Sequence, residues 1–145
     1  MDKEVRREII LDNYQNPTNR GLVNKEEYLK VNSNNDSCID NIDIEVKIEN
    51  NKIEDMRFDV EACAISTSAT SIMINTFLGK TIEEAKEIIK NYESMIDEKE
   101  YDSSILEELN VYEDIYKQAN RKKCALLPIE GLKKLIERYE EKEND

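Results

Sequence analysis

The sequence contains no histidine among its 145 residues. Without imidazole, neither a Ser-His nor a Cys-His catalytic pair can be built, and no metal site can use a histidine ligand. A bound metal would have to sit on thiolates and carboxylates. Glycine and proline are also rare, at 3 and 2 residues, which leaves little room for linkers. We therefore expect residues 1–145 to form one domain.

Basic residues are outnumbered, with 21 lysines and arginines against 33 acidic residues and a formal net charge of -12. Such a surface repels a nucleic-acid backbone and favours a protein partner with a basic face. No stretch approaches the roughly 20 apolar residues of a membrane span. The first residues, MDKEVRREII, are charged and unlike a signal peptide. We expect a cytoplasmic protein that binds neither membranes nor nucleic acid.

Two patterns near the start of the chain predict a helix and a β-hairpin. Apolar spacing predicts a helix over residues 2–14, which Asn16-Pro17 ends because a residue before proline resists the helical region. Apolar and charged residues then alternate over residues 42–48, and Asn50-Asn51 predicts a tight turn. A second alternating strand follows around residues 56–60. One face of this sheet must be covered.

Later segments predict the helices that cover it. A small-residue helix should run from Cys63 to Leu78-Gly79, followed by helices around residues 85–92 and 132–139, each with apolar residues at helical spacing. Pro128 should stand in the first turn of the last helix. Residues 92–120 are acidic and predict only one or two short helices, and residues 140–145 a frayed tail. The predicted fold class is α+β.

The three cysteines stand at boundaries between these elements. Cys38 lies in a polar loop, Cys63 follows the hairpin, and Cys124 precedes the last helix. An odd number of cysteines cannot pair completely, and a cytosol keeps thiols reduced. Residues 121–123, Arg-Lys-Lys, directly precede Cys124. Their charge should lower the pKa of that thiol and stabilise a thiolate or a persulfide anion.

Asp40 lies two residues after Cys38, so one loop could direct both side chains at the same point. Three thiolates and one carboxylate would suit a tetrahedral zinc ion. The carboxylate oxygen exchanges more readily than a fourth thiolate would, so such a site is less inert than a structural Cys₄ site. Spacing alone leaves alternatives open: the cysteines could be incidental or core-filling thiols, and Asp40 a turn residue.

Four segments carry a more specific pattern: YQNPTNRG at 14–21, NNDSCID at 34–40, ACAIS at 62–66 and RKKCALL at 121–127. Together they resemble the SufU branch of the NifU/IscU-type iron-sulfur cluster assembly proteins, in order and spacing along nearly the whole chain. The resemblance implies an α+β fold in which a small antiparallel sheet of about three strands packs against several helices.

The resemblance also implies a function. The metal ligands would be Cys38, Asp40, Cys63 and Cys124, and the metal zinc. The chain would accept persulfide sulfur from a pyridoxal-phosphate-dependent cysteine desulfurase of the SufS type, with Cys124 as the acceptor, and pass it to downstream iron-sulfur assembly proteins. That role is a sulfurtransferase-like carrier rather than an enzyme that turns over a small molecule.

Some positions bear on which branch the chain resembles. Lys123 stands where the scaffold proteins carry histidine, Arg121 matches a family arginine, and residues 92–120 resemble an insertion of the SufU branch. Ile39 and Ala62 replace family glycines. A β-branched residue resists loop conformations that glycine permits, so Ile39 could change how Asp40 faces the metal.

Two other hypotheses stay open at this point. In the first, the same ligands hold a [2Fe-2S] cluster and the protein is a scaffold on which the cluster is assembled and then transferred. The lysine in place of histidine argues against this hypothesis. In the second, the metal only stabilises an interaction domain that carries no sulfur.

Overall fold

The computed structural model describes residues 1–34, 40–61 and 63–143. Its helices and strands follow the chain in this order: α1 (Lys3–Gln15), β1 (Leu29–Asn34), β2 (Asn41–Glu49), β3 (Lys52–Glu61), α2 (Ala64–Phe77), α3 (Ile82–Ile96), the 3₁₀ helices η1 (Ser103–Ile105), η2 (Glu107–Tyr112) and η3 (Ile115–Lys117), and α4 (Ala119–Glu143). The predicted α+β class is confirmed.

The sheet is antiparallel, with the strands in the order β1-β2-β3. The hairpin of β2 and β3 is confirmed, and both residues of its turn, Asn50 and Asn51, have positive φ angles of 52° and 63°. Asparagine tolerates this left-handed region better than most residues, which explains why the turn was readable. The strand β1 pairs with β2, and the sequence pattern did not predict where this strand lies.

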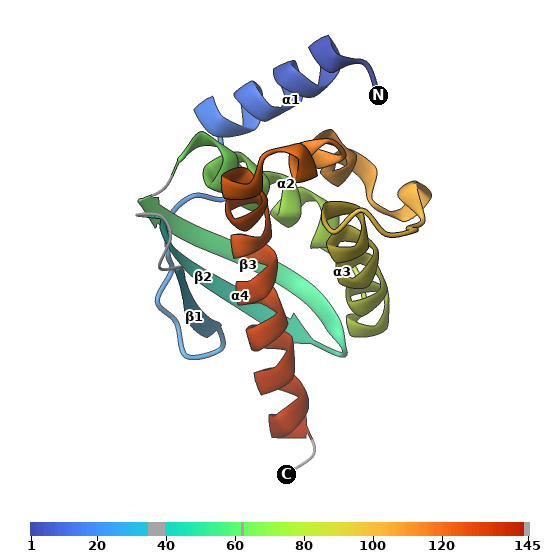
Figure 1. Cartoon of the computed structure of the whole chain (residues 1–145). Coiled ribbons are helices and arrows are strands. Elements are labelled where there is room, and N and C mark those ends of the chain that lie inside the picture. The colour runs from blue at the N-terminus through green and yellow to red at the C-terminus, as the bar shows by residue number, and fades with distance from the viewer. Residues whose placement is uncertain (35–39, 62, 144–145) are drawn as a thin grey trace.

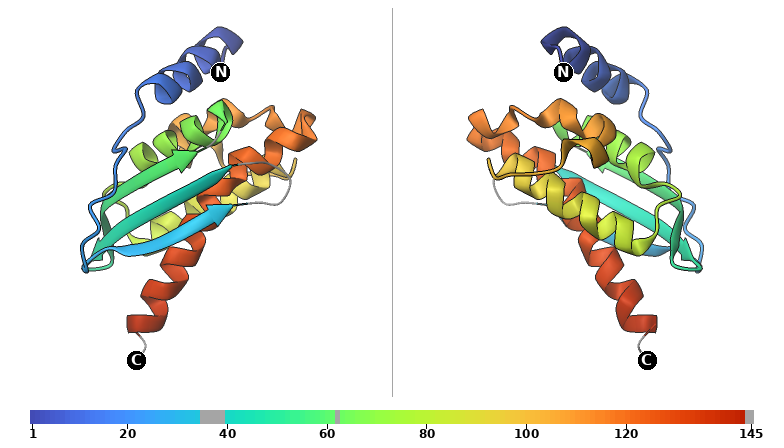
Figure 2. Two further views of the ribbon diagram at one scale, coloured as in Figure 1. Left: turned by 90° about the vertical axis from the view of Figure 1, so that its left-hand side faces the viewer. Right: turned by 90° about the vertical axis from the view of Figure 1, so that its right-hand side faces the viewer.

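The helices pack on one face of the sheet (Figures 1 and 2). α4 packs on β1 and β2, and α2 packs on β3 and on α4. The approach of α4 is close, since a Cβ added at Gly131 would lie 2.8 Å from Ile44 Cδ1. α1 lies across α2 beyond the end of the sheet, with Asp2 as its N-cap. The start of α4, the start of α2 and the start of β2 therefore meet at the α1 end of the molecule.

The last helix starts earlier than its sequence pattern indicated. α4 begins at Ala119, so Cys124 and Pro128 both lie inside it rather than before it and in its first turn. A proline has no N–H to donate to the carbonyl four residues earlier, which here belongs to Cys124. Ser66 Oγ lies 3.2 Å from this carbonyl oxygen and donates to it instead. A hydroxyl from another helix thus lies near the carbonyl that the helical N–H would otherwise reach.

The ends of the helical region also differ from the predictions. α3 extends to Ile96, and three short 3₁₀ helices follow it where one or two short helices were expected. Residues 140–143, predicted to belong to a frayed tail, continue α4, while 144–145 lie outside the described residues. Leu109, Val111 and Tyr112 of the 3₁₀ segment are buried and join the core. This burial explains why the segment is more regular than its acidic composition predicted. Among the helices that the structure describes, none is long and apolar enough to cross a membrane.

Candidate metal centre

Asp40, Cys63 and Cys124 come together where β2, α2 and α4 begin. One ligand atom from each of these residues lies within 4.8 Å of the others. Asp40 and Cys124 are buried and Cys63 is half-buried. Two thiols and a carboxylate converging from three elements are a donor set that suits zinc. All three were predicted ligands; the fourth, Cys38, lies outside the described residues, as do Ile39 and Ala62.

The carboxylate of Asp40 is held by the first turn of α2. The backbone N–H of Cys63 donates to Asp40 Oδ1 at 2.7 Å, and the hydroxyl of Ser66 donates to Oδ2 at 2.6 Å. Cys63 Sγ also lies 3.3 Å from Oδ2. Because two donors fix both oxygens, the carboxylate plane has a defined direction. Asp40 is thus a buried polar group rather than a turn residue facing solvent, with 2% of its surface exposed.

Cys63 is the N-cap of α2. Its sulfur accepts a hydrogen bond from the backbone N–H of Ser66 at 3.5 Å. Cys63 therefore lies at the element boundary where the sequence pattern placed it.

Cys124 differs from the expectation. Burial raises the pKa of its thiol to about 12, assisted by its neighbours Cys63 and Asp40. The prediction that the preceding basic residues lower this pKa is wrong: the side chains of Arg121 and Lys123 are exposed, while the sulfur is turned inward near the Asn120 carbonyl, 3.6 Å away. A bound divalent cation acts in the opposite direction, because a coordinating thiol is deprotonated.

Ser66 was not among the predicted site residues. It is fully buried, and its hydroxyl lies within hydrogen-bond range of Asp40 and of the Cys124 carbonyl. A signal was present in the sequence, since a hydroxyl three residues after a helix N-cap is well placed to serve groups at that helix start.

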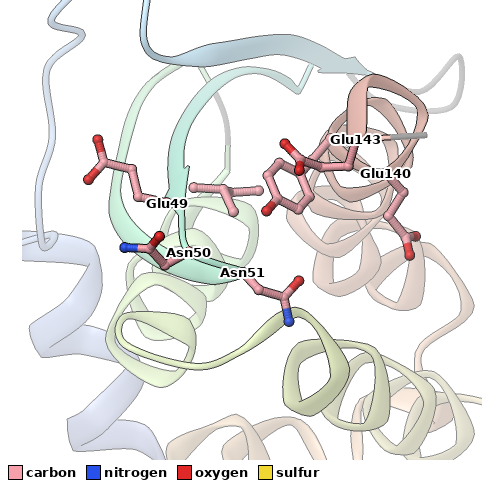
Figure 3. A pocket seen from close by; sticks show the side chains of 7 residues that line it. Glu49, Asn50, Asn51, Glu140 and Glu143 are labelled. Carbon is pink, nitrogen blue, oxygen red and sulfur yellow. The ribbon is translucent and has the colours of Figure 1, made fainter. Parts of the chain in front are cut away.

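A large cavity lies at the other end of the sheet, with a volume of about 840 Å³. The residues in Figure 3 come from the β2-β3 turn and the last turns of α4, and they include Glu49, Glu140 and Glu143 but no cysteine. The length of β2, nine residues or roughly 30 Å, separates this cavity from Asp40. Its like-charged lining offers no thiol chemistry, so the cysteine cluster is the stronger candidate site.

Comparisons with known proteins show what the whole chain is similar to. The profile of the family described as "NifU-like N terminal domain" matches residues 5–145. The chain is 36% identical over 135 residues to the "Zinc-dependent sulfurtransferase SufU" of Bacillus subtilis, covering 92% of this chain and 90% of that protein. It is 30% identical over 131 residues to the "Iron-sulfur cluster assembly scaffold protein IscU" of Streptococcus pyogenes, covering 90% and 81%.

Solved structures show the same likeness. A crystal structure from Fervidobacterium islandicum, described as an iron-sulfur cluster assembly scaffold protein for the SUF system, superposes with a TM-score of 0.82 at 32% identity and covers 89% of this chain and 94% of the other. A NifU-like N-terminal protein from Brucella abortus superposes with a TM-score of 0.85 at 17% identity, covering 97% and 99%, which shows the shared fold.

Proposed function

Since the chain belongs to the NifU-like N-terminal domain family, we propose that it is a zinc-dependent sulfur acceptor in iron-sulfur cluster assembly. The observation that carries the proposal is the convergence of Asp40, Cys63 and Cys124 within 4.8 Å. The similarity to the Bacillus sulfurtransferase over nine-tenths of both chains supports it. The partner would be a cysteine desulfurase of the SufS type, and the compartment the reducing cytoplasm.

In this proposal Cys38, Asp40, Cys63 and Cys124 hold zinc, which keeps the thiols deprotonated and shielded from oxidation. The protein holds Asp40 through two hydrogen bonds and Cys63 at a helix N-terminus. A carboxylate oxygen is the hardest donor of the four and exchanges more readily than a thiolate. The site would therefore protect its thiols while leaving one position open to change.

The transfer step needs only one thiolate and one persulfide. The thiolate of Cys124 attacks the outer sulfur of the persulfide on the desulfurase cysteine. A new S–S bond forms to Cys124, the old S–S bond breaks, and its electron pair leaves with the desulfurase cysteine as a thiolate. No external oxidant or reductant is consumed. The raised pKa of the Cys124 thiol means that this sulfur reacts only where its environment removes the proton.

In this proposal the desulfurase would approach from the side of α1. A groove of about 470 Å³ lies between α1, the start of α2 and the segment before α4, and Ala64 and Ile65, directly after Cys63, are part of its wall. Leu11 and Tyr14 of α1 line it and are about half exposed.

A second candidate function is a scaffold that holds a [2Fe-2S] cluster on the same ligands. The similarity to the Streptococcus scaffold protein favours it. The position of Lys123, where the scaffold proteins are expected to carry histidine, weighs against it. A metal-stabilised interaction domain without sulfur transfer is the remaining possibility for the same side chains.

The test combines elemental analysis with a desulfurase assay. We expect about one zinc per chain and a clear stimulation of a cysteine desulfurase, which Cys124→Ser abolishes. Lys134→Ala, a change of an exposed side chain on the same helix, is the matched control and should leave stimulation unchanged. Iron with sulfide in the purified protein would favour the scaffold. Zinc without stimulation would favour the interaction domain, and stimulation retained in Cys124→Ser would exclude this cysteine as the acceptor.

A further inference from the structure

Ser66 contacts all three candidate ligand residues that the structure describes. Its side chain is fully buried in the first turn of α2. The hydroxyl oxygen lies 2.6 Å from Asp40 Oδ2, 3.2 Å from the backbone oxygen of Cys124, and 3.7 Å from Cys63 Sγ. A buried hydroxyl at the centre of a set of metal ligands is in a position to orient them.

The contact with Cys124 exists because of Pro128. In an α-helix the N–H of residue 128 would donate to the carbonyl of residue 124, but proline has none. Both residues are buried in α4, so water does not readily take the place of the missing donor. Leaving a buried carbonyl without a donor is costly, and Ser66 supplies one from the neighbouring helix.

The hydroxyl has one proton and two acceptors. The shorter contact, to Asp40, has the geometry of a charge-assisted bond to a carboxylate, and the longer contact, to the Cys124 carbonyl, is the weaker one. While Asp40 faces the thiols, the proton directs its carboxylate.

We propose that Ser66 is a positioning residue of the metal centre: its buried hydroxyl orients the carboxylate of Asp40 as a ligand. The inference rests on the proposed metal-binding function and adds to it a residue that is not itself a ligand. Groups that orient metal ligands typically contribute a factor of about 10–100 in metal affinity.

The experiment measures zinc affinity by competition with a chromophoric chelator, without a desulfurase. Ser66→Ala should bind zinc about 10–100-fold more weakly than the wild type. Ser68→Ala is the matched control, because Ser68 is equally buried in α2 and its hydroxyl contacts Tyr112 rather than a ligand residue. We expect this control to stay within about twofold of the wild type. Ser66→Thr, which keeps the hydroxyl, should recover part of the affinity.

Pro128→Ala distinguishes a purely structural role of Ser66 from a role in metal binding, because it returns an N–H to the Cys124 carbonyl. In that background Ser66→Ala no longer leaves this carbonyl without a donor, so the loss of thermal stability should shrink. The loss of zinc affinity should persist, because the hydroxyl that donates to Asp40 Oδ2 is still missing. The double variant also keeps the test decisive if Ser66→Ala alone does not fold.

The outcomes distinguish the two proposals. If the wild type binds zinc and Ser66→Ala binds it as tightly as Ser68→Ala does, the role of Ser66 is refuted and the proposed function stands. If Pro128→Ala restores both stability and affinity to Ser66→Ala, its role is structural and the inference fails. If the wild type itself binds no zinc, the proposed function fails first.

Discussion

The consecutive helices α2 and α3 are almost equal in length, at 14 and 15 residues, but they are built differently. α3 has one apolar face directed at the core and a charged face directed at solvent. α2 is buried on nearly all sides and yet contains a run of serine and threonine residues. A helix with hydroxyls in the core is stable only when those hydroxyls have hydrogen-bond partners. The two helices therefore differ in their need for such partners.

The partners of the α2 hydroxyls belong to different parts of the chain. Ser66 donates to Asp40 of the metal centre, Ser68 shares a hydrogen bond of 2.5 Å with Tyr112, and Ser71 donates to Asn13 of α1 at 2.6 Å. Ser71 also accepts from the Thr18 backbone at 2.8 Å. α2 therefore connects the metal centre, the 3₁₀ segment and α1 through specific polar contacts, whereas α3 contributes mainly apolar area.

The N-caps show the same difference. α3 starts with a capping box, in which Thr81 Oγ1 accepts from the Glu84 amide at 3.2 Å and Glu84 Oε1 accepts from the Thr81 amide at 3.0 Å. α2 starts with Cys63, whose sulfur accepts a longer bond of 3.5 Å. Sulfur is a weak acceptor. The cap of α3 is a strong one, and the cap of α2 is a weaker acceptor that belongs to the candidate metal centre.

The largest expected effect comes from exchanging the cap atom of α2. Zinc at 1,000 times its dissociation constant should raise the free energy of unfolding of the wild type by about 4 kcal/mol. Cys63→Ser should lose this increment, because the hydroxyl is a poor zinc ligand, while its metal-free stability stays close to the wild type because serine is a good N-cap. Urea unfolding with and without zinc measures both quantities.

Thr81→Ser is the matched change at the cap of α3, and it should keep the full zinc increment. If Cys63→Ser were stabilised by zinc as strongly as Thr81→Ser, Cys63 would not be a ligand. The two caps would then differ in strength alone and not in role.

A smaller effect tests whether α2 hydroxyls matter more than α3 methylenes. Ser71→Ala removes the partner of both the Asn13 side chain and the Thr18 amide, and unsatisfied buried groups cost about 1–3 kcal/mol each. We expect a loss of about 2 kcal/mol in unfolding free energy. Ile88→Val in α3 should lose about 1 kcal/mol. Urea unfolding of both metal-free variants measures these losses. A larger loss of unfolding free energy for Ile88→Val would mean that the α3 methylene matters more than the α2 hydroxyl.

The same contrast explains what the sequence could predict. α3 was readable because Ala85, Ile88, Ile89 and Tyr92 follow the helical period, and the hairpin because its residues alternate and its turn is Asn-Asn. These patterns are local. The metal-binding set was predicted from a family resemblance, and Asp40, Cys63 and Cys124 do converge.

What the sequence could not show depends on contacts between distant segments. Pro128 indicated a helix start, but α4 passes through it. The donor to the Cys124 carbonyl is Ser66, which lies 62 residues earlier in the chain. The basic residues before Cys124 indicated a low thiol pKa. This prediction was wrong because their side chains face solvent while the sulfur faces the core, which a sequence does not reveal. Neither fact has a local signature.

The smallest expected effect concerns the capping box of α3 and its dependence on pH. The pKa of Glu84 lies below its usual value because its carboxylate accepts hydrogen bonds from the Thr81 backbone and side chain. A carboxyl group with a lowered folded-state pKa contributes stability above its unfolded pKa of about 4.3, and that contribution is lost as the pH falls through the folded value. Acidification should therefore reduce the hydrogen-exchange protection of the Thr81 amide, which donates to this carboxylate.

Glu84→Gln is the matched variant for this measurement, because glutamine keeps the oxygen acceptor of a capping box without a titrating proton. The difference in protection between wild type and variant should be largest near neutral pH and should close below about pH 4, since the charged acceptor is then neutralised. Equal protection of both proteins at every pH would show that the charge of Glu84 adds nothing to the cap. The N-terminus of α3 would then resemble that of α2, because its capping hydrogen bonds would contribute little to stability.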